Sequence, residues 1–252
     1  MKRTITLFIA LFALSTQVRA QASDQAVQRV LSDIGISDRS ARTIEQQMAN
    51  YRIGAVRMAG VAANGFGASE ASVQSVLSSA STDDRSSANV YQQIASYTLA
   101  NAKMLGVLAR TLKADASAVN AVLSDASTSG NNSSNVFQQT AVFAMANIRM
   151  AGVAARAAGA SMNAVDGVLS DARSGDASAE NVYQQIANYT IANTRMLGVL
   201  ATALGANPAR VAAVLSSAST RDTSASNVYQ QIASYNFAVV EMTGVAASSR
   251  HK

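Results

Sequence analysis

Apolar and polar positions along this chain follow a pattern that returns every 46 residues. The clearest copy is NVYQQIASYTLANAKMLGVLA at residues 89–109, and close copies begin at residues 43, 135, 181 and 227. Within it, Val90, Ile94, Tyr97, Met104 and Leu108 recur at helical spacings, which places them on one face of a helix. The pattern therefore predicts one long helix of about 22 residues in each repeat.

A shorter apolar pattern precedes each long helix. Val119, Val122 and Leu123 are spaced for one face of a helix of about 12 residues, which we expect to fold back on the long helix. The segment that follows, such as STSGNNSS at 127–134, is polar and predicts a loop. The chain shows no strand pattern.

Capping residues mark where these helices begin and end. Asn89 stands three residues before Gln92, which is the capping-box spacing, and the same pair recurs in the other long helices. Gly159 and Gly205 are placed to end long helices. The predicted N-caps of the short helices are Ser69, Asp115, Ser161 and Asn207.

A fixed period of this length is typical of stacked supersecondary units that bury their apolar faces against each other. We predict an all-α fold of five tandem 46-residue short-long helix pairs, forming an α-solenoid or an elongated helical bundle. The pattern leaves open whether the stack is an open superhelix or compact. The repeat domain spans residues 21–252, with units at about 21–66, 67–112, 113–158, 159–204 and 205–252.

Residues 1–20 have the features of a signal peptide: basic Lys2 and Arg3, a short apolar core, and small residues before Gln21. They predict export to a periplasm or the extracellular space. The chain carries 20 basic and 15 acidic residues, and removing Lys2, Arg3 and Arg19 leaves 20 − 3 − 15 = +2. This small net charge gives no reason to expect nucleic acid as a partner. No later stretch predicts a transmembrane span.

Candidate chemistry is sparse, and we predict no catalytic, cofactor-binding or metal-binding residues. Met104 and its four equivalents lie on the apolar seam, where methionine is typical of core packing. His251 is the only histidine, there is no cysteine, and no G-x-S-x-G or calcium-loop pattern occurs. The aromatic columns exchange Tyr for Phe, which favours packing over chemistry at the hydroxyl, with a stacking surface for ligands as the alternative.

Two columns change character at the ends of the repeat. Asn101, Asn147 and Asn193 lie on the seam of the inner units, where buried asparagine typically sets register, whereas the outer units have Ala55 and Val239. A column of basic residues becomes Glu241 in the last unit. The set Ala55, Val239, Val240 and Glu241 is therefore our candidate assembly interface.

These observations predict an exported, non-enzymatic structural or adhesive protein that self-associates into a homo-oligomer or filament. Uncapped apolar ends would favour head-to-tail contact between copies. The alternative is an extracytoplasmic binding module that carries a lipid or another apolar ligand between its amphipathic helices. A filled core favours the first function, and a lined tunnel favours the second.

Overall fold

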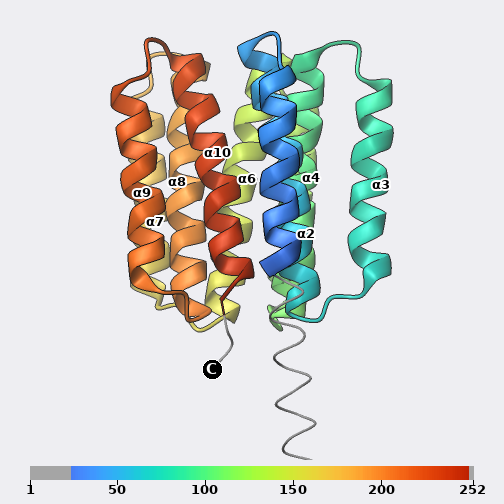
Figure 1. Cartoon of the computed structure of the whole chain (residues 1–252), viewed down its shortest axis with the longest axis vertical. Helices are drawn as coiled ribbons and strands as arrows, with labels where there is room; N and C mark the ends of the chain where they lie inside the picture. The colour runs from blue at the N-terminus through green and yellow to red at the C-terminus, as the bar shows by residue number, and fades with distance from the viewer. Residues whose placement is uncertain (1–23, 250–252) are drawn as a thin grey trace, which may run out of the picture.

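The computed structural model describes residues 24–249, which form helices and connecting turns without a strand (Figure 1). The predicted signal peptide, residues 1–20, lies outside the described part. The all-α prediction is confirmed. A short helix over residues 24–40 is followed by α2 (Ile44–Gly65), α3 (Glu70–Ser86), α4 (Val90–Thr111), α5 (Ala116–Asn131), α6 (Val136–Ala157), α7 (Met162–Ala177), α8 (Val182–Ala203), α9 (Pro208–Thr223) and α10 (Val228–Ala247).

The five long helices form a closed ring. Each packs on the long helix of the next unit in the order α2, α4, α6, α8, α10, and the contact of α10 with α2 is similar in extent to the other four. Figure 1 shows α10 and α2 side by side at the front of the bundle. Of the two predicted architectures the structure is therefore the bundle, and the chain's last long helix covers its first.

All five long helices run in the same direction, because a short helix returns the chain between each long helix and the next (Figure 1). The short helices α3, α5, α7 and α9 pack mainly on the long helix that follows them. Their 16 or 17 residues exceed the predicted length, since part of each predicted loop is helical. In α5 this last stretch has tertiary contacts, because Ala126 and Gly130 are both buried.

The predicted caps are confirmed, with one difference in geometry. The Asn89 side chain accepts hydrogen bonds from the backbone N–H groups of Tyr91 and Gln92. The side-chain oxygen Oε1 of Gln92 accepts a hydrogen bond from the backbone N–H of Ala88, the residue before the cap, at 2.7 Å. Gly159 adopts a φ of 96° after the end of α6, a left-handed conformation that favours glycine.

Glycine and methionine side by side interlock neighbouring units. A Cβ on Gly152 would lie 3.1 Å from Val165 Cγ1 and 3.4 Å from Met196 Cε. The same contact closes the ring, because Met58 Cε approaches Gly244 of the last unit. Each methionine of the column therefore fills the space that the absent Cβ leaves on the preceding long helix.

Alternating large and small side chains fill the ring near the C-terminal ends of the long helices. Leu105 and Leu108 on α4 and Leu197 and Leu200 on α8 are fully buried. The equivalent positions on α2 and α6 are fully buried alanines: Ala59, Ala62, Ala151 and Ala154. Large residues on two non-adjacent helices thus pack between small ones, which fills a five-helix ring without crowding.

No described helix is long and apolar enough to span a membrane.

Candidate functional site

The candidate assembly residues lie where the two ends of the repeat array meet. Ala55 on α2 and Val239 and Val240 on α10 are buried, and Val240 is 0% exposed. A Cβ on Gly54 would lie 3.6 Å from Val240 Cγ2, so the α2–α10 contact is direct. The apolar end residues therefore cover each other within one chain, and they are not displayed to a second chain in this structure.

Glu241 also has a partner within the chain. Its Oε2 lies 3.0 Å from Nη1 of Arg221 on α9. The other units place a basic residue at this position, and in three of them it pairs with an acid on the preceding short helix, as Arg149 does with Asp125 at 2.8 Å. The charge reversal at Glu241 is thus balanced locally. Such part-exposed pairs contribute little stability.

The asparagine column forms side-chain bonds between α4 and α6. Asn101 Nδ2 donates to Asn147 Oδ1 at 3.1 Å, and Asn147 Nδ2 donates to the Thr98 carbonyl at 3.0 Å. Asn193 is buried on α8, and its Oδ1 has no protein partner. The closing seam has Ala55 and Val239 in this column and is apolar. Register setting by the asparagines stays a prediction, supported by these two bonds.

Aspartates recur at one position of the repeat, and the sequence analysis did not predict a role for them. Tyr97 on α4 is buried beside Asp84 of α3, and both burial and this carboxylate raise the pKa of the Tyr97 hydroxyl. The 46-residue spacing indicates this pairing, because the middle unit changes both positions together. It has Phe143 where the other units have tyrosine and Gly130 where they have aspartate. The hydroxyl therefore lies beside a carboxylate at these positions, a contact that the Tyr/Phe exchange alone did not indicate. The other pairs are Tyr51 with Asp38, Tyr189 with Asp176 and Tyr235 with Asp222.

A double-mutant cycle measures this pairing. A Cβ on Gly130 would lie 2.5 Å from Phe143 Cε1, so we expect Gly130→Asp alone to destabilise the protein by about 1–3 kcal/mol. Gly130→Asp combined with Phe143→Tyr recreates the pair of the other units. We expect the double variant to recover at least about 1 kcal/mol of the loss in urea unfolding. Additive effects of the two changes would contradict the pairing.

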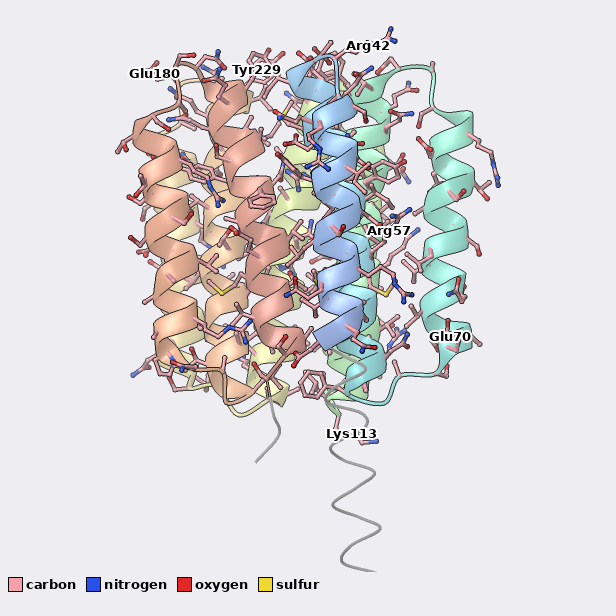
Figure 2. The ribbon with its side chains drawn as sticks, viewed as in Figure 1. Arg42, Arg57, Glu70, Lys113, Glu180 and Tyr229 are labelled. Carbon is pink, nitrogen blue, oxygen red and sulfur yellow. The ribbon has the colours of Figure 1, made fainter. Side chains whose placement is uncertain are left out.

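Aromatic side chains form a collar at the N-terminal end of the ring. We define the collar as Glu45, Tyr91, Phe137, Tyr183 and Tyr229, one residue from each long helix at the same repeat position. Successive ring centroids lie 5.0, 4.9 and 5.0 Å apart, and the Tyr91 hydroxyl donates to Glu45 at 3.3 Å. Figure 2 labels Tyr229 at this end, opposite Lys113 and Glu70. The pKa of Tyr229 is raised to about 12. The larger cause is a hydrogen bond with Tyr183, and the second is burial.

Beneath the collar lies Arg52, the one charged side chain buried among the described residues. It is 4% exposed, and its Nη2 donates to Thr190 Oγ1 at 3.2 Å on α8, a helix that is not a neighbour of α2. Arg52 therefore reaches across the ring interior. Burial lowers the pKa of Arg52 to about 10, which leaves the guanidinium charged at neutral pH.

Polar groups without protein partners accompany Arg52. Its Nε has no hydrogen-bond acceptor, and both amide atoms of buried Asn236 are unpaired. Asn236 occupies in α10 the repeat position that Arg52 occupies in α2. Sequence reasoning passed over Arg52, although its signal is visible, because the equivalent positions hold the uncharged residues Thr98, Ala144, Thr190 and Asn236.

The outer wall carries grooves that recur with the repeat. One groove of about 530 Å³ is floored by Val199 of α8 and walled by Val168 of α7 and by Val211 and Leu215 of α9. A groove of about 590 Å³ two units earlier uses the equivalent Val76 of α3 and Val107 of α4. We call these the lower grooves.

Among residues 24–249, no three His, Cys, Asp or Glu side chains come together as a metal site. His251 lies outside the described residues. Comparison of the chain with protein-family models, with curated proteins and with solved structures finds no match. The functional argument therefore depends on the geometry of this molecule alone.

Proposed function

We propose that this protein is an exported, non-enzymatic structural or adhesive building block that associates with copies of itself. The observation that supports it is the filled, closed ring, whose interior is occupied by its own side chains along most of its length. The cavity lined by all five long helices has a volume of about 30 Å³, far below the several hundred Å³ of ordinary ligand pockets.

Ring closure changes how such assembly works. Because α10 covers α2, copies do not extend one another by adding units to a free end of the array. Contact between copies instead uses the outer wall, where the lower grooves recur from unit to unit. A surface that contacts a different surface on the next copy generates extended arrays when the contacts do not close.

Met162 supplies an apolar side chain to fill such a groove. It is the first residue of α7 and is 62% exposed, the most exposed large apolar side chain in the described part. The valines that line the lower groove along α8 are only partly buried. We therefore place the contact between Met162 of one copy and a lower groove of another, where burial of both apolar surfaces is favourable.

Met162→Glu tests this contact without disturbing the fold. The equivalent position of α3 is Glu70, and an acid in the first turn of a helix is favourable. For the mature protein we expect concentration-dependent growth in light scattering and ordered assemblies in electron microscopy, with Met162→Glu weakening association at least about tenfold. Met162→Leu, the matched control, keeps the apolar contact and the assembly.

Two outcomes would contradict the proposal. A wild-type protein that stays monomeric across a wide concentration range would exclude self-association. Assembly that Met162→Glu leaves unchanged would exclude the groove contact.

The second candidate function is carriage of a lipid or another apolar ligand. The lower groove along α8 favours it, because its volume of about 530 Å³ falls in the range of ligand pockets and its walls are mostly apolar. Native mass spectrometry of the protein as isolated distinguishes the two functions. A bound apolar molecule of defined mass would support carriage.

A further inference from the structure

Among residues 24–249, no ion pair supplies a counterion for the charge of Arg52. The acidic residues that form ion pairs lie on the outer wall, and none of these pairs includes Arg52. Its hydrogen bond to the neutral hydroxyl of Thr190 satisfies a single N–H and supplies no negative charge. An arginine buried without an acid is costly, because burial removes water from the guanidinium and nothing replaces its charge stabilisation.

Arg52 lines the cavity beneath the collar. The walls come from all five long helices, with Thr140 as the second polar wall residue below the aromatic side chains. Ile94, Ile186 and Ile232 complete the walls. The cavity is therefore a small apolar space with a cation and a hydroxyl, which is the setting in which an anion interacts most strongly with an N–H donor.

The direction of the long helices adds a second favourable field. All five begin at the collar end, so the positive ends of their five macrodipoles surround the cavity. A closed ring of parallel helices thus concentrates positive potential where Arg52 lies. The carboxylate of Glu45 opposes this field at the collar, and it is held there by the Tyr91 hydroxyl.

We propose that the cavity beneath the collar binds one small monovalent anion of the size of chloride, held by Arg52. The volume of about 30 Å³ sets the size, because roughly 10–15 Å³ of such space is enough for one water molecule, so the cavity has room for one small ion only. Sulfate, phosphate and carboxylates with an alkyl chain are too large. The bound anion neutralises the guanidinium and fixes the position of the Arg52 side chain across the ring.

The test uses the mature protein with chloride as the probe. We expect excess ³⁵Cl line width in NMR that bromide competes away. The thermal unfolding midpoint should rise with chloride at constant ionic strength, with gluconate as the balancing anion, because chloride binds the folded state and gluconate is too large for the cavity. Arg52→Met should reduce the excess line width to the buffer level and remove the chloride dependence of the midpoint.

Arg57→Met is the matched control. Arg57 lies on the same helix but on the outer wall, 3.9 Å from Asp33, so its loss removes one exposed cation and leaves the cavity intact (Figure 2). We expect this variant to keep both chloride effects. Equal chloride responses of the Arg52→Met and Arg57→Met proteins would show surface binding and overturn the proposal.

A crystal soaked in bromide gives an independent answer if Arg52→Met does not fold. An anomalous peak within hydrogen-bond distance of the Arg52 guanidinium supports the proposal. Bromide peaks confined to the outer wall, or a wild-type protein whose unfolding midpoint is the same in chloride and in gluconate, overturn it.

Discussion

Val240→Glu is expected to destabilise the protein by at least about 3 kcal/mol, because it places an unpaired carboxylate in the seam that closes the ring. Val240 is fully buried on α10 and faces Gly54 of α2. Among the described residues, no ion pair joins α2 to α10. We expect urea unfolding at a much lower midpoint and faster hydrogen exchange in α2 and α10.

Val240→Thr is the matched control for this seam. The equivalent residue of the preceding unit is Thr194, which is fully buried and donates its hydroxyl to the Thr190 carbonyl one turn earlier at 3.2 Å. A threonine at position 240 can make the same bond within α10, so its cost should stay near 1 kcal/mol. If the Glu and Thr variants unfold at the same midpoint, α2 and α10 do not close the ring.

Gly152→Leu should be comparably damaging, at about 3 kcal/mol or more. Helix propensity alone favours leucine over glycine by up to about 1 kcal/mol. The structure opposes this gain, since even a Cβ at position 152 meets Val165 at 3.1 Å and Met196 at 3.4 Å. The longer side chain must separate α6 from both α7 and α8, which overpacks two interfaces at once. Thermal unfolding followed by circular dichroism measures the loss.

Gly167→Leu provides the comparison. Gly167 lies within α7, and a Cβ there would meet no atom within 4 Å. The same substitution should therefore be neutral or stabilise the protein by up to about 1 kcal/mol through propensity. A Gly152→Leu protein as stable as Gly167→Leu would show that the long helices do not pack through their glycines.

Local features were predictable because they depend on residues close together in the chain. Asn89 caps α4 and Gly159 ends α6 with positive φ, since both effects act within one helical turn. Periodicity also identified the buried faces that carry Met104 and Leu108. The predicted loop at 127–134 was wrong for most of its length, because tertiary contacts of Ala126 and Gly130 extend α5 through polar residues.

The candidate site was only partly predictable. The sequence identified Val240 and Glu241 as departures from the repeat, but their partners are Gly54 at the other end of the array and Arg221 on α9. The Tyr–Asp pairs were readable from the 46-residue spacing and were overlooked. Arg52 differed visibly from its equivalents, yet the sequence does not say that this column faces the interior of a ring.

The sequence by itself determined the helices, their caps, their order and the residues that each unit buries, because these follow from local periodicity repeated five times. The tertiary structure alone decided that the array closes. Closure depends on the small rotation between neighbouring units, which is set by side-chain packing such as Met196 on Gly152, and these rotations add up until α10 meets α2. Because of this closure, the two ends of the repeat array meet in a buried seam, and Arg52 lies in the interior of the ring.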